Sequence, residues 1–176
     1  MRSEIIGNSN VFAIEFYVES IRIETVYGFC KLWLQNQFLG DIDDPIYLTG
    51  FLPSLHGLAY YFNRYELVDN IPSVPTSPTE FVKMWNENEN LKSNYILIGA
   101  GFDKFYKLCF RNRDRLVFYW CLDPDVTNSP EDFPKYIDYP KGVHVAEVQI
   151  SAIKEVADAF KTRLEELVFE NKSKIT

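Results

Sequence analysis

The two histidines are the first candidates for catalytic residues, because histidine is the most frequent general acid or base in enzymes. His56 lies in a segment expected to be a helix, and His144 lies in one expected to be a strand. A nucleophile activated by histidine needs a third group that orients the ring. Ser54, in Leu-Pro-Ser-Leu-His-Gly, lacks the glycine-flanked sharp turn that exposes a hydrolase serine. The sequence therefore predicts no catalytic residue.

Cofactor and metal motifs are incomplete. Gly99-Ala-Gly101 follows a short apolar run, but the third glycine of a dinucleotide fingerprint is missing, so we expect a bend there. Asp123-Pro-Asp125 starts like a calcium loop and lacks its later glycine and glutamate. Cys30, Cys109 and Cys121 lie in apolar strands without metal-like or redox-like spacing, which predicts buried reduced thiols. We expect no cofactor and no metal.

Acidic side chains gather in two segments, and these are the strongest binding candidates. One is the turn at residues 41–44, and the other is the long loop at residues 123–142, where tyrosines are interleaved. Carboxylates beside exposed tyrosines suit the binding of a cationic protein, whereas the alternative is a solvated loop that only keeps the protein soluble. The candidate contact residues are Asp41, Asp43, Asp44, Asp123, Asp125, Glu131, Asp132, Tyr136, Asp138 and Tyr139.

Composition narrows the classes of partner and compartment. The 176 residues carry a net charge of −7, which argues against direct nucleic-acid binding because phosphates need clustered Lys and Arg. No basic leader with an apolar run and no membrane-length apolar stretch is present in the sequence, so we expect a soluble, cytoplasmic protein that does not bind membranes. The length predicts a single domain over residues 1–176.

The first half of the chain predicts three antiparallel strands followed by a helix. Alternating apolar residues indicate strands over 11–19, 27–35 and 38–41, with a tight reversal at Gln35-Asn36-Gln37. Three- and four-residue apolar spacing indicates a helix over 46–68, bent or broken near Pro53. Asp44 is its expected N-cap and Pro45 its first helical residue.

The second half predicts helix, strands and a last helix. Ser77-Pro78-Thr79-Glu80 is a capping box that starts a helix of about 12 residues. We expect a short strand at 95–98, a hairpin of 104–112 with 115–122, a strand at 143–150 and a helix capped by Ser151. This order predicts an α+β fold, with a mainly antiparallel sheet and three principal helices packed on it.

The opening block resembles a known family. Ile6-Gly7, Phe12-Ala-Ile-Glu-Phe16 and the stretch Gly28–Asp41 with Trp33 and Gly40 are similar to the start of immunity protein 42, although Gln37 stands where glycine is expected after Asn36. The resemblance implies an immunity protein of polymorphic toxin or contact-dependent growth inhibition systems. Such a protein binds the C-terminal toxin domain in the cytoplasm, neutralises it and catalyses no reaction.

Our hypothesis from the sequence is a stoichiometric inhibitor that forms a 1:1 complex. The favoured partner is a basic nuclease toxin, and an RNase in particular. A nuclease site needs positive groups to hold phosphate, and an acidic loop can cover these groups or bind beside them and exclude the substrate. One alternative is a small cytosolic hydrolase or transferase that uses His56 or His144 beside a carboxylate. Another is a structural subunit of a larger assembly.

Overall fold

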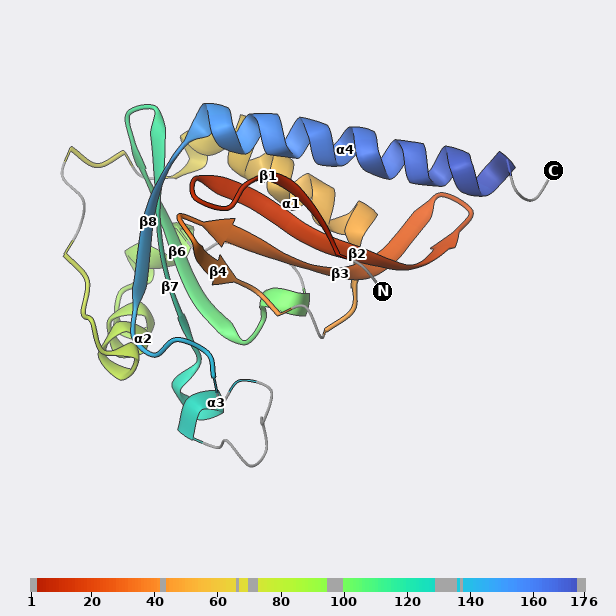
Figure 1. Cartoon of the computed structure of the whole chain (residues 1–176). Coiled ribbons are helices and arrows are strands. Elements are labelled where there is room, and N and C mark those ends of the chain that lie inside the picture. Colours follow the sequence, from red (N-terminus) through yellow and green to blue (C-terminus); the bar gives the residue numbers. More distant parts are fainter. Residues whose placement is uncertain are drawn as a thin grey trace. The chain divides into compact units, whose positions relative to one another are not determined.

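A computed structural model describes residues 3–41, 44–65, 67–69, 73–94, 100–128, 136 and 138–173 (Figure 1). The chain divides into two compact units, and each is described by itself. Unit 1 comprises Met1–Phe62, Leu97–Asp103 and Val148–Thr176, and unit 2 comprises Asn63–Ile96 and Lys104–Glu147. Antiparallel sheets and helices are present, so the predicted α+β class is confirmed. The described residues form two sheets, where the sequence suggested one.

The sheet of unit 1 contains the three predicted strands and two that the sequence did not predict, β1 and β5. Its antiparallel order is β1-β2-β3-β4, and a short strand β5 also pairs with β3. Strand β1 lies along β2, with Ile6 opposite Ile14, and β5 lies in the segment that the sequence predicted to be the start of a helix. The bounds are β1 Glu4–Asn8, β2 Phe12–Arg22, β3 Thr25–Leu34, β4 Gln37–Leu39 and β5 Ile46–Tyr47.

The turn between β3 and β4 uses two residues. Gln35 and Asn36 have φ values of 51° and 65°, and Leu34 pairs directly with Gln37. Positive φ at both central residues is the pattern of a type I′ hairpin turn, which matches the twist of the flanking strands. The predicted reversal is therefore present, and Gln37 needs no glycine because it is already the first residue of β4.

Helices α1 (Leu48–Tyr60) and α4 (Ile150–Ser173) pack on one face of the unit 1 sheet, as Figure 1 shows. Because strand side chains alternate, Phe16 and its neighbours at every second position point into this layer. Phe160 of α4 is fully buried, with its ring edge-on to Phe16 at 5.1 Å and to Phe51 at 6.3 Å. These three rings join the sheet to both helices.

A charged contact also holds α4 to the edge strand β1. Arg163 donates two hydrogen bonds to the carboxylate of Glu4, from Nε at 2.8 Å and from Nη2 at 3.0 Å. Such two-pronged pairing is stronger than a single bond between neutral groups. The hydrogen bond from Arg163 holds the pKa of Glu4 below its usual value.

The boundaries of both long helices differ from the prediction. The first begins at Leu48 instead of near Asp44, because Ile46 and Tyr47 pair with β3 opposite Gly28 and Tyr27. It ends at Tyr60, well before 68, and Pro53 lies inside it. Helix α4 begins at Ile150, so Ser151 is inside the helix and is not its cap. Each helix begins directly after a strand, Ile46–Tyr47 before α1 and His144–Gln149 before α4.

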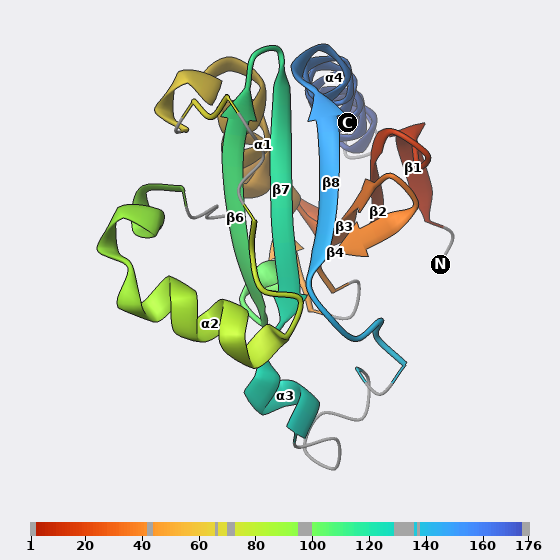
Figure 2. The same ribbon diagram turned by 90° about the vertical axis from the view of Figure 1, so that its left-hand side faces the viewer.

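Unit 2 contains the predicted hairpin. Strands β6 (Phe105–Asn112) and β7 (Arg115–Leu122) are antiparallel and in register from Phe105 with Leu122 to Asn112 with Arg115. Strand β8 (His144–Gln149), whose last two residues belong to unit 1, lies beside β7, giving the order β6-β7-β8 that Figure 2 shows face on.

Helix α2 (Pro78–Glu87) supplies the apolar cover of this hairpin. Its buried Phe81 packs in a cluster with Leu108, Val117 and Tyr119 of the two strands. Pro78 is the first helical residue, as predicted, although the side chain of Ser77 makes no capping hydrogen bond. The short helix α3 (Pro124–Asn128) lies in what the sequence predicted to be loop, and the strand predicted at 95–98 lies outside the described residues.

Candidate interaction surfaces

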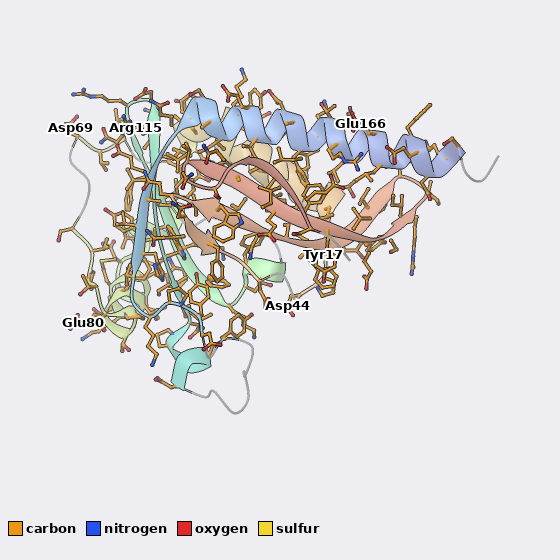
Figure 3. The ribbon with its side chains drawn as sticks, in the orientation of Figure 1. Tyr17, Asp44, Asp69, Glu80, Arg115 and Glu166 are labelled. Carbon is orange, nitrogen blue, oxygen red and sulfur yellow. The ribbon has the colours of Figure 1, made fainter. Side chains whose placement is uncertain are left out.

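The acidic turn after β4 is partly built into the fold of unit 1. Asp41 is buried, and its backbone N–H donates to the carbonyl of Gly101 at 2.8 Å. The candidate Asp41 is therefore not at the surface, because a segment sixty residues later in the chain packs against it. Asp44 is half-buried on the following loop (Figure 3), and Asp43 lies outside the described residues.

The second acidic segment begins at the end of β7 in unit 2. Asp123 accepts a hydrogen bond at Oδ1 from the backbone N–H of Asp125 at 2.9 Å, a local turn that Asp favours at the start of a helix. The carboxylate of Asp125 is exposed, and that of Asp123 is half-buried. Burial, with these two carboxylates as smaller causes, raises the pKa of nearby Tyr106. Glu131 and Asp132 lie outside the described residues.

The two tyrosines of this segment do not form the exposed contact that we expected. Tyr136 and Tyr139 are buried, with their rings against Phe105. The hydroxyl of Tyr139 accepts a hydrogen bond from the indole N–H of Trp120 at 3.2 Å, and burial raises the pKa of this tyrosine. A buried tyrosine usually finds such a partner. Asp138, between them, is exposed.

Both histidines pack against aromatic rings in the part of the chain that the structure describes. His56 packs beside the ring of Tyr60, whose hydroxyl donates to Asp158 at 2.6 Å. The ring of His144 stacks on Trp120 and places Nε2 3.0 Å from the carbonyl of Pro140. None of these described contacts joins a histidine ring to a serine or cysteine, which is the pairing that nucleophile activation requires.

The three cysteines are free and buried, as predicted. Burial is the main cause that raises the pKa of Cys121 to about 12, and it raises the pKa values of Cys30 and Cys109 as well. A thiol is nucleophilic as the thiolate, so burial and a raised pKa both disfavour a nucleophilic role for these thiols. Within the described part of the chain, no group of three or more His, Cys, Asp or Glu side chains is placed to hold a metal ion.

A strip of side chains along β3 of the unit 1 sheet, which contains Phe29, Lys31 and Trp33, was not among the predicted candidates. It lies on the opposite face from the buried Cys30, Leu32 and Leu34. Trp33 donates to Glu15 at 2.9 Å, and Lys31 is 3.3 Å from the same carboxylate and 4.8 Å from the Trp33 ring. Rings fixed in this way are typical interface anchors. The alternation of Phe29, Lys31 and Trp33 is the signal in the sequence, and by itself it predicts only a strand.

The described residues form an α+β protein in which an antiparallel sheet carries the strip along β3 and the segments outside the strands carry the exposed candidate carboxylates. The chain belongs to the immunity protein 42 family, whose model matches residues 4–163. The resemblance seen in the opening block is thereby confirmed over most of the chain.

A solved structure, that of CdiI from Burkholderia dolosa AUO158, has a similar fold. The TM-score is 0.53 at 11% sequence identity, and the match covers 91% of this chain and 99% of that chain. A comparison with curated proteins finds no match. In the part of the chain that the structure describes, no helix is both long and apolar enough to cross a membrane.

Proposed function

We propose that this chain is a cytoplasmic immunity protein that binds and neutralises the C-terminal domain of a cognate bacterial toxin without catalysing a reaction. The observation that carries the proposal is the family match over residues 4–163. The CdiI structure adds support, because a protein of that name has a similar fold. Because the family match spans both units, we also propose that residues 1–176 act as one immunity-protein domain.

The charge of the chain supports a basic partner. With a net charge of −7, the protein attracts a cationic domain at long range and raises the association rate at low salt. A nuclease presents such a surface because it must hold phosphates, and we favour an RNase. The inhibitor would then form a 1:1 complex that covers the nuclease site or blocks the approach of the substrate.

We propose that the exposed or half-exposed acids among the candidates meet the toxin. Asp44 on unit 1 and Asp123, Asp125 and Asp138 on unit 2 present carboxylates to solvent. Asp43, Glu131 and Asp132 remain in the proposed set on the sequence argument. The buried Asp41, Tyr136 and Tyr139 instead support the segments that carry these acids.

Charge reversal at two exposed acids tests the proposed contact. In Asp125→Lys combined with Asp138→Lys, the association rate with the toxin domain should fall at least about tenfold at low salt, because reversal weakens steering. Surface plasmon resonance at low and high salt measures the effect, which should shrink as salt screens the charges. Glu80→Lys combined with Lys83→Glu, on exposed positions of α2, is the control that leaves the net charge unchanged. An unaltered rate in the double reversal would remove these residues from the contact.

Co-expression tests the function itself. Cells that produce the toxin domain encoded beside this chain should stop growing, and cells that also produce this protein should grow normally. Growth arrest despite a folded and abundant protein would contradict the proposal.

The two histidines separate an inhibitor from an enzyme. In a variant with His56→Gln and His144→Gln, protection should be unchanged, because an inhibitor needs no general base. Circular dichroism establishes that the variant is folded. Lost protection in a folded variant would instead support the hydrolase or transferase alternative.

A further inference from the structure

Strand β1 is the edge of the unit 1 sheet, and a further strand can reach it. The sheet order β1-β2-β3-β4 ends at β1, and Figure 2 shows this strand at one side of the sheet, next to α4. In an edge strand every second residue directs its N–H and C=O away from the sheet. All five residues of Glu4–Asn8 are half-buried or exposed, so another extended chain can approach these backbone groups.

The edge of β1 lacks the usual protection of an edge strand. Proteins commonly guard such edges with lysine, proline or a covering segment. The stretch Ile5–Asn8 carries no charge and no proline. In unit 2, by contrast, a neighbouring segment covers the edge strand β6, because the backbone N–H of Val68 donates to the carbonyl of Arg111 at 2.9 Å. The edge of β1 therefore has the features of a strand that pairs with another chain.

A groove lies beside β1, between this strand and the first half of α4. Its volume is about 370 Å³, which is enough for a large apolar side chain. Gly7 lines the groove without a side chain, so an incoming backbone can come close there. Ile5, on the opposite face of β1, is 56% exposed. A strand added to β1 would place alternate side chains in the groove and beside Ile5. The apolar lining of the groove includes Ile6, Val11, Ala152, Val156 and Ala159.

Backbone chemistry and charge together select the partner of this edge. An extended peptide fits, because the groups that the strand offers are backbone N–H and C=O. The charged residue that lines the groove is Glu155, which is exposed. A second copy of this chain would bring a net charge of −7 to this acidic groove, whereas a basic domain is attracted to it.

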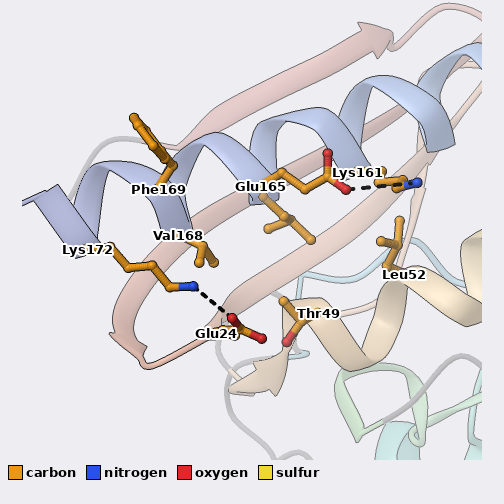
Figure 4. A pocket seen from close by; sticks show the side chains of 9 residues that line it. Glu24, Thr49, Leu52, Lys161, Glu165, Val168, Phe169 and Lys172 are labelled. Carbon is orange, nitrogen blue, oxygen red and sulfur yellow. Dashed lines mark hydrogen bonds and ion pairs between the residues drawn. The ribbon is translucent and has the colours of Figure 1, made fainter.

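The pocket between α1 and α4 gives no such indication of a partner (Figure 4). Lys172 pairs there with Glu24 at 2.7 Å, and Glu165 pairs with Lys161 at 3.9 Å. Because these charges are already paired within the chain, they favour neither a basic nor an acidic partner.

We propose that an extended segment of the basic toxin domain adds to β1 as a further strand, with an apolar side chain in the groove and a Lys or Arg beside Glu155. This inference rests on the proposed function, because its partner is the toxin domain of that function. Main-chain hydrogen bonds supply affinity in this mode of recognition, and the groove and Glu155 determine which side chains fit.

Hydrogen exchange of the full chain, alone and saturated with the toxin domain encoded beside it, tests the strand addition directly. Amide protons in Ile5–Asn8 that point away from β2 should exchange at least about tenfold more slowly in the complex, because new hydrogen bonds protect them. Unchanged exchange across Ile5–Asn8 in a saturated complex would overturn the inference.

Two variants test the groove. Ala159→Phe fills it from an exposed position of α4, so binding of the toxin domain should weaken at least about tenfold while resistance to urea stays unchanged. Glu155→Lys should weaken binding at least about tenfold more than Glu165→Lys does. Glu165→Lys is the matched control, because it makes the same change in net charge at an exposed position of the same helix outside this groove.

The outcomes separate this inference from the proposed function. If the original chain neither binds nor neutralises the toxin domain, both are wrong. If it binds and neutralises the domain, and Ala159→Phe does so equally well, only the strand addition is wrong. Sedimentation equilibrium of the chain alone adds a further check: a dimer that Ala159→Phe abolishes would overturn the inference, because a second copy would then occupy the edge.

Discussion

Replacing Gly28 with alanine is expected to lower the free energy of unfolding by about 3 kcal/mol, at the upper end of the range for overpacking. A Cβ atom at this position would clash with the carbonyl oxygen of Tyr17 and would lie 2.9 Å from Cδ1 of Leu48. The oxygen belongs to the backbone of β2 and cannot rotate away. Gly28 lies opposite both Val18 and Ile46, next to the register shift in β2, so relief would require the strands to separate.

Urea unfolding followed by circular dichroism measures this effect. Gly50→Ala is the matched control, because Gly50 is exposed in α1 and a Cβ there would lie 3.1 Å from Cβ of Tyr47. We expect that control to be within about 1 kcal/mol of the original chain, since alanine also favours the helix. Equal midpoints for Gly28→Ala and Gly50→Ala would show that β2 and β3 are not packed as described.

Replacing Phe160 with alanine should cost about 3–5 kcal/mol, the range for a large aromatic residue removed from a core. Its ring contacts Phe16 of the sheet and Phe51 of α1, so the cavity would lie where three elements of unit 1 meet. The surrounding backbone is held by strand pairing and can collapse only partly into that space.

Phe169→Ala on the same helix is the control for this loss. Phe169 is exposed, so its truncation should change the free energy of unfolding by less than about 0.5 kcal/mol. Urea titration followed by circular dichroism measures both variants. Equal losses in the two would contradict the orientation of α4, in which Phe160 faces the sheet.

Local patterns predicted most of the fold. The alternation in 12–18 and 29–34 and the apolar stripe of α4 place the side chains that the structure buries, because strand and helix periodicities determine which residues share a face. The start of α1 could not be predicted in this way. Asp44 and Pro45 form a local start signal, but Ile46 and Tyr47 pair with residues about twenty positions earlier, and that pairing takes precedence.

The exposure of the candidate contact residues could also be predicted only in part from the sequence. Charge alone singled out Asp125 and Asp138, and both are exposed. Asp41 and Tyr139 were expected at the surface, but they are buried by contacts with Gly101 and Trp120, which are far away in the sequence. The pocket lined by Leu52, Leu164 and Phe169 depends on how α1 and α4 meet, so no local motif could have indicated it.

The most direct test of the central claim is a titration of the purified toxin domain with this protein, monitored by cleavage of RNA. We predict that cleavage falls linearly and reaches zero at one equivalent, because each copy of this chain occupies one toxin domain. Calorimetry on the same samples should give the same one-to-one endpoint. Undiminished cleavage and no heat of binding with an excess of folded protein would contradict the account.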